Sequence, residues 1–108
     1  MTTNPVRWTS RLRGMYGKPP YDPDAEDGFE SPLLAAYNEA IRRVASEMNV
    51  PLVDVRASYP DFASKRNLAI DELLLDGLHP NDIGHELVAG LLVPVIRDVL
   101  RQPRSAAP

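Results

Sequence analysis

Residues 50–55, Val50-Pro51-Leu52-Val53-Asp54-Val55, are the stretch on which the predicted fold depends. The run is short, apolar and rich in β-branched side chains, which is typical of a strand buried on both faces. A helical pattern precedes it, and the order helix, short turn, buried strand is typical of α/β proteins. We therefore predict an α/β fold with residues 50–55 as an interior strand.

The helix before this strand is predicted over residues 31–49. Ser31 can cap it, and Pro32 suits the first helical position, where a missing N–H has no cost. Apolar side chains at helical spacing form one stripe, namely Leu33, Leu34, Tyr37, Ile41, Val44, Ala45 and Met48. This stripe indicates an amphipathic helix that covers a sheet.

A longer helix is predicted over residues 81–101. Asn81 is a good N-cap, and Asp82 suits the positive end of the helix dipole. A broad apolar face follows, made of Ile83, Leu87, Val88, Leu91, Leu92, Val95, Ile96, Val99 and Leu100. Pro94 should kink this helix, because it removes one backbone hydrogen bond and its ring clashes with the preceding turn.

The remaining segments are predicted to be less regular. Residues 9–30 contain many glycines and prolines and should form a long surface loop, which is usually functional or mobile. Residues 57–75 should form loop and short helices, and residues 102–108 a frayed tail. Four aromatic residues in or next to this loop could line an acyl or sugar pocket or anchor the loop to the core; they are Trp8, Tyr16, Tyr21 and Phe29.

Length and charge narrow the class of protein. The chain has 108 residues, which suits a single domain. Its net charge is -3 with both signs interspersed, so nucleic acid is not an expected partner. No apolar run approaches the length of a membrane span, and no signal peptide is recognisable, which leaves the compartment undetermined. The absence of cysteine excludes disulfides and thiolate chemistry.

The strongest candidate for chemistry is the run Asp76-Gly77-Leu78-His79-Pro80. Histidine is the side chain whose pKa suits general-base work near neutral pH. A carboxylate bonded to one ring nitrogen selects the tautomer that leaves the other nitrogen free to accept a proton. Asp76 and His79 are therefore the predicted catalytic residues. The alternative is that both merely cap and decorate a surface turn.

Other ligand sites are less favoured. His79 and His85 are six residues apart, an offset that does not put both on one helix face as an i, i+4 spacing would, so neither a metal nor a cofactor is expected. His85 is better interpreted as a residue of the first helical turn that packs locally. Asp54 could bind a ligand at the end of a strand, but a capping role is favoured.

The run from Asp76 to His85, followed by an apolar helix, resembles the final conserved block of SGNH (GDSL-type) hydrolases. In that family an Asp-x-x-His-Pro turn supplies the acid and base of the catalytic triad, and a long helix closes the fold. The resemblance covers residues 31–101. It implies that residues 1–101 are the C-terminal part of a flavodoxin-like three-layer α/β/α sandwich, and that the function is hydrolysis of a small-molecule ester.

The sequence also departs from the family pattern. The family's G-D-S nucleophile block and its G-x-N-D block are absent, and no serine follows Gly-Asp among Ser10, Ser31, Ser46, Ser58, Ser64 and Ser105. Residues 1–5 resemble the end of the family's central strand. We therefore interpret the chain as the C-terminal half of such an enzyme, inactive and marginally stable alone, with the N-terminal half as a possible partner. The alternative is a non-catalytic scaffold or binding domain.

Overall fold

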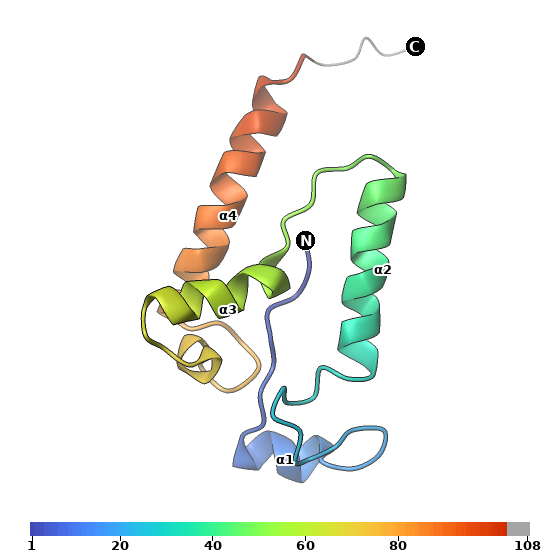
Figure 1. The fold of residues 1–108 in the computed structure, drawn as a ribbon, viewed down its shortest axis with the longest axis vertical. Coiled ribbons are helices and arrows are strands. Elements are labelled where there is room, and N and C mark those ends of the chain that lie inside the picture. Colours follow the sequence, from blue (N-terminus) through green and yellow to red (C-terminus); the bar gives the residue numbers. More distant parts are fainter. Residues whose placement is uncertain (104–108) are drawn as a thin grey trace.

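The structure is a computed structural model, and it describes residues 1–103. Its helices, in chain order, are α1 (Ser10–Tyr16), α2 (Leu33–Glu47), α3 (Val55–Lys65), the 3-10 helix η1 (Ile70–Leu73) and α4 (Asp82–Arg101). Figure 1 shows α2 and α4 on opposite sides of the extended N-terminal segment, with α1 at one end of the molecule. Most of the predicted tail, residues 104–108, lies outside the described part of the chain.

The prediction of an α/β sandwich is wrong. Residues 1–103 contain no β-strand, and their only bridge pairs Leu74 with Pro80. A strand is stable only when a neighbouring strand satisfies its backbone groups. Residues 50–54 share a single backbone hydrogen bond with the N-terminal segment, from Thr2 N–H to the carbonyl of Val53 at 3.1 Å. One such bond does not make a sheet, so the apolar run stays irregular.

Asp54 is predicted to lie in the strand, but in the structure it is the N-cap residue of helix α3. Its carboxylate accepts from the backbone N–H of Ala57 at 3.2 Å and from the Thr2 hydroxyl at 2.8 Å. The Arg42 guanidinium donates to it at 2.7 Å. This bond is the main reason that the pKa of Asp54 falls to about 2, with the Thr2 and Ala57 bonds adding to the effect. The favoured capping role of Asp54 is confirmed.

The two long helices agree with the sequence pattern to different degrees. Asn81 caps α4 as predicted, since its side-chain oxygen accepts from the N–H groups of Ile83 and Gly84, both at 3.1 Å. Helix α4 continues through Pro94 to Arg101. The predicted Ser31 cap of α2 is wrong, because this helix begins at Leu33 after Pro32 and has no side-chain cap.

Helix α1 lies inside the segment predicted to be a loop, so that prediction is wrong for residues 10–16. The Thr9 hydroxyl caps α1 by accepting from the N–H of Leu12 at 3.2 Å. Leu12 is the buried residue of α1, and its side chain packs this helix against the rest of the molecule. The prediction of loop and short helices for residues 57–75 is confirmed, because α3 and η1 lie there with irregular segments between and after them.

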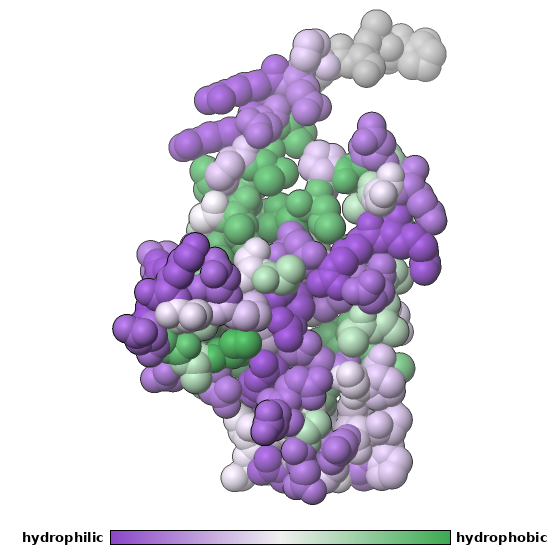
Figure 2. Space-filling model, viewed as in Figure 1, coloured by the Kyte–Doolittle hydropathy of each residue, from purple (hydrophilic) through white to green (hydrophobic). Residues whose placement is uncertain are grey.

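The hydrophobic core is small and lies where α3, η1 and α4 meet. Its buried members are Val53, Val55, Tyr59, Ala63, Leu73, Leu74 and Leu87. The apolar stripe of α2 is largely outside this core: Tyr37 is 65% exposed and Met48 69%. Figure 2 shows hydrophobic residues at the surface along α4 and toward α2. The expected cover for these faces, a sheet, is not present within residues 1–103.

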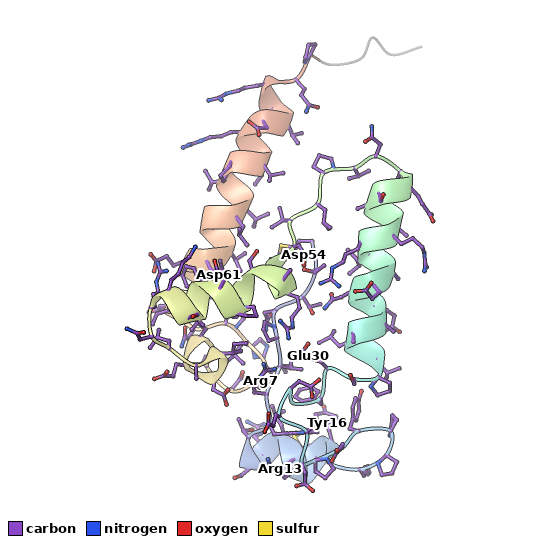
Figure 3. The ribbon with its side chains drawn as sticks, in the orientation of Figure 1. Arg7, Arg13, Tyr16, Glu30, Asp54 and Asp61 are labelled. Atoms are coloured by element: carbon purple, nitrogen blue, oxygen red, sulfur yellow. The ribbon has the colours of Figure 1, made fainter. Side chains whose placement is uncertain are left out.

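The N-terminal segment is held by polar contacts on several elements. Asn38 of α2 exchanges two hydrogen bonds with Thr3, each 3.0 Å long. The buried Glu30 carboxylate pairs with Arg7 at 2.9 Å and with Arg56 of α3 at 2.8 Å. Figure 3 shows Arg7 and Glu30 together near the centre of the molecule. These contacts fix residues 2–7 between α2 and α3.

Candidate active site

The motif turn (residues 76–80) brings the two predicted catalytic side chains together. The Nδ1 atom of His79 lies 2.8 Å from the Oδ2 atom of Asp76. The other oxygen of Asp76 accepts from the backbone N–H groups of Leu78 at 3.0 Å and His79 at 2.8 Å. A short acidic side chain that bonds the backbone two and three residues ahead is a common way to close a turn. Both side chains remain accessible, His79 at 66% and Asp76 at 50%.

Gly77 gives the motif turn its shape. Its φ is +82°, a left-handed conformation that glycine adopts without strain. Its carbonyl accepts from the backbone N–H of Arg7 at 2.8 Å. A Cβ atom at this position would lie 2.5 Å from the Arg7 carbonyl oxygen and 2.8 Å from the methyl group of Thr9. The turn is therefore pressed against the N-terminal segment in a way that only glycine permits.

Further backbone contacts close the motif turn on both sides. The N–H of Leu75 donates to the carbonyl of His79 at 2.7 Å, next to the bridge between Leu74 and Pro80. The Asn4 side chain donates to the carbonyl of Leu78 at 3.0 Å. The position of the motif turn is thus set by backbone hydrogen bonds within it, by the backbone N–H of Arg7 and by the side-chain amide of Asn4.

The electrostatics of the pair favour one tautomer. The hydrogen bond from His79 is the main reason that the pKa of Asp76 falls to about 2, and the backbone N–H groups of His79 and Leu78 lower it further. Asp76 is therefore ionised at neutral pH and acts only as an acceptor. A neutral His79 then carries its proton on Nδ1 and has a lone pair on Nε2. Within residues 1–103, no side chain hydrogen-bonds to Nε2.

His79 lines a groove of about 340 Å³, which we call the α1 groove. Its walls come from helix α1 and from the motif turn, and the residues are Arg11, Leu12, Met15, Tyr16, Asp76, Leu78 and His79. The α1 side of this groove does not follow from the sequence prediction, which places residues 9–30 in a loop. The local signal for helix α1 is Thr9 with the apolar Leu12 three residues later, because a capping threonine before an apolar residue marks the start of a helix.

The other candidate residues lie apart from the motif pair. His85 is in the first turn of α4 and lines two different grooves, one with Ile83 and one with Val88. Ser58 donates its hydroxyl proton to the carbonyl of Asp54 at 2.9 Å. Within residues 1–103, no serine hydroxyl forms a hydrogen bond with His79.

The aromatic residues of segment 9–30 and Trp8 gather around Phe29. The ring centroids of Trp8, Tyr21 and Tyr16 lie 4.9, 6.1 and 6.2 Å from that of Phe29. The indole N–H of Trp8 also donates to the carbonyl of Asp22 at 2.9 Å. These contacts match the anchoring alternative. Tyr16, on helix α1 in Figure 3, additionally lines the α1 groove.

Comparison with known proteins identifies the family. The model of the GDSL-like Lipase/Acylhydrolase family matches residues 7–87, which is more than half of the chain. The chain therefore belongs to the GDSL-like lipase and acylhydrolase family, as the resemblance in the sequence predicted. No curated protein and no solved structure matches the chain.

Membership in this family supports a general acylhydrolase role with a small-molecule substrate. Within the described residues, none of the helices has the length and apolar character needed to cross a bilayer. The catalytic role of Asp76 and His79 stays a prediction, because family membership does not by itself assign a role to either residue.

Proposed function

We propose that residues 1–101 are the C-terminal part of a serine ester hydrolase domain of the GDSL type, and that Asp76 and His79 are the acid and base of its catalytic triad. The observation that carries the proposal is the 2.8 Å contact between His79 Nδ1 and Asp76 Oδ2. The accessible imidazole beside the α1 groove and the match to the family over residues 7–87 support it further.

The proposed chemistry is a two-step acyl transfer. A serine hydroxyl attacks the ester carbonyl while Nε2 of His79 takes its proton, and the resulting imidazolium returns that proton to the departing alcohol. Water then repeats the sequence on the acyl-enzyme, with His79 again as the base, and releases the carboxylic acid. Asp76 holds the imidazole in one orientation and stabilises its cation.

The nucleophile must come from another stretch of polypeptide. No G-D-S or G-x-N-D block is present in this sequence. We propose that a segment with both blocks supplies the serine and the donors that stabilise the oxyanion, usually the largest single catalytic contribution. An in-frame G-D-S block in the coding sequence upstream of Met1 would support a truncated or split gene.

A complementation assay tests the proposal. The full chain is mixed with a separately produced G-D-S-bearing segment, and hydrolysis of a short-chain aryl ester is followed. We expect no turnover from the chain alone and recovery in the mixture. His79→Ala should abolish recovery, and Asp76→Asn should lower it on the order of 10³- to 10⁴-fold, as loss of the orienting carboxylate does in other triads.

His85→Ala is the matched control, because it removes the other imidazole of the chain and lies at a different groove. It should recover as well as the unchanged chain. Equal recovery with His79→Ala would refute the proposed base. Absence of recovery with every chain would favour the alternative of a non-catalytic scaffold.

A further inference from the structure

Arg11 is the charged residue of the α1 groove that has no partner among residues 1–103. It lies on helix α1, and its side chain lines the groove together with His79. Within residues 1–103, no ion pair and no hydrogen bond involves its guanidinium group. Its neighbours differ: Arg7 pairs with Glu30 at 2.9 Å, and Arg13 donates to the carbonyl of Pro23 at 2.9 Å. Arg11 is therefore free to bind an external anion.

The side chains around Arg11 in the groove are largely apolar. Leu12 is buried, whereas Met15 is 50% exposed, Tyr16 43% and Leu78 38%. Large apolar side chains exposed on a concave surface are typical of ligand sites, where a few polar groups set the orientation of the ligand. This lining matches a ligand with a hydrocarbon part and one charged end.

The groove has one negative group, the carboxylate of Asp76. That charge is already met by three donors, the imidazole N–H of His79 and two backbone N–H groups. The positive charge of Arg11 has no such partner in the described part of the chain. The charges that line the groove therefore favour binding of an anion near Arg11. A guanidinium group binds a carboxylate through two parallel hydrogen bonds.

We propose that the α1 groove selects esters that carry a free anionic group, with Arg11 binding that group and Met15 and Leu78 contacting the hydrocarbon chain. This inference rests on the proposed function, because it assigns a substrate class to the groove beside His79. In this arrangement the anionic end lies on the α1 wall and the ester end on the wall formed by the motif turn.

The test is a binding titration with two probes of equal length. Monomethyl adipate carries a methyl ester and a free carboxylate, and methyl hexanoate has a methyl group in place of the carboxyl group. Amide shifts of Arg11, Met15, Leu78 and His79 are followed in NMR spectra of the full chain. We expect monomethyl adipate to bind about tenfold more tightly than methyl hexanoate, as one charge-assisted contact allows.

Substitutions then separate charge from shape. Arg11→Gln should remove the preference for the anionic probe and leave the affinity for methyl hexanoate unchanged, while Arg11→Lys should retain part of the preference. Arg97→Gln on α4 is the matched control and should behave like the unchanged chain. Circular dichroism checks that each variant is folded. The preference should also weaken as salt is added.

Equal affinity for the two probes, or a preference that survives in Arg11→Gln, would overturn the inference. The titration measures binding without turnover, so its failure can be told apart from a failure of the proposed triad. Absence of recovery with every chain in the complementation assay would favour the non-catalytic alternative and leave the binding result intact.

Discussion

Gly77 is the residue whose replacement tests the motif turn most directly. Its φ of +82° and its close approach to the Arg7 carbonyl both exclude a side chain. We expect Gly77→Ala to lower the free energy of unfolding by about 1–3 kcal/mol, because the new Cβ meets backbone and strains the turn. Urea denaturation measures the change, and NMR reports whether the contact between His79 and Asp76 survives.

Gly90 provides the control for this substitution. It lies inside helix α4, and a Cβ atom there would meet nothing within 4 Å. Gly90→Ala should raise the free energy of unfolding by about 0.5–1 kcal/mol, the usual gain in a helix interior. A Gly77→Ala variant as stable as Gly90→Ala would contradict the packing described for the motif turn.

The pH dependence of Asp76 is a second test at the residue scale. Its pKa of about 2 in the folded chain lies below its ordinary value of 3.8. Ionised Asp76 therefore stabilises the fold fully above about pH 4, and this contribution is lost as the pH falls toward 2. Titration of the carboxyl carbon by NMR measures the pKa. His79→Ala should move it up toward 3.8, and an unchanged value would contradict the ring contact as the main cause.

Tyr59 tests the core beneath the motif turn. The residue is fully buried, and its hydroxyl has no hydrogen-bond partner among the described residues. Because an unpaired buried hydroxyl is unfavourable, we expect Tyr59→Phe to leave the free energy of unfolding unchanged or raise it by about 1 kcal/mol. Tyr59→Ala should lower it by about 3–5 kcal/mol through loss of packing. A clear loss of stability in Tyr59→Phe would point to a hidden partner of the hydroxyl.

At the scale of elements, helix α4 depends on its Asn81 cap. The side-chain oxygen of Asn81 accepts from two backbone N–H groups of the first turn, and its amide donates to the carbonyl of Glu72 at 2.6 Å. Asn81→Ala should lower the free energy of unfolding by about 0.5–2 kcal/mol in thermal or urea unfolding. Gln102→Ala, at the opposite end of α4, should change it little.

The elements that sequence predicts well are those whose signals are local. The cap at Asn81 and the apolar spacing of residues 83–100 lie within α4 itself, so the start and end of this helix follow from the sequence. The same holds for the contact between Asp76 and His79, which are three residues apart in one turn. Helix α1 does not follow from the pattern, because the glycines and prolines after it indicate a loop.

Residues 50–54 show the opposite case. Their apolar, β-branched pattern is typical of a strand. A strand also requires a neighbouring strand, and the local pattern does not show whether one is present. The groove between α1 and the motif turn could not be predicted either, since Arg11 and His79 are distant in sequence and line the same groove only because the N-terminal segment and the start of α1 pack against Gly77. Long-range packing decides both features.

For the whole molecule, the main feature is that many of its large apolar side chains are not buried. The Cα radius of gyration is 16.4 Å, whereas a compact domain of 100 residues has about 13 Å. Apolar residues of α2 and α4 remain at the surface, including Val44 at 47% exposure and Leu100 at 78%. Exposed faces of this kind favour association.

We therefore expect the isolated chain to associate as its concentration rises and to unfold with low cooperativity. Sedimentation velocity and calorimetry measure the two properties. A double substitution on α2, Val44→Glu with Met48→Glu, should shift the chain toward monomer, whereas Arg43→Gln and Glu47→Gln on the other face of α2 should not. A sharp melt of a monomer at all concentrations would contradict this expectation.

The backbone bond between Arg7 and Gly77 has a consequence for the order of events during synthesis. Residues 4–7 leave the ribosome long before residues 77 and 78, which provide their hydrogen-bond partners. The backbone N–H of Arg7 therefore lacks this acceptor until some seventy later residues have been added, although the Arg7 side chain can pair with Glu30 much earlier. The local contact between His79 and Asp76 can form as soon as the motif turn is made, but the turn acquires its bonds to Asn4 and Arg7 only at this stage, so completion of the candidate site is a late step in synthesis.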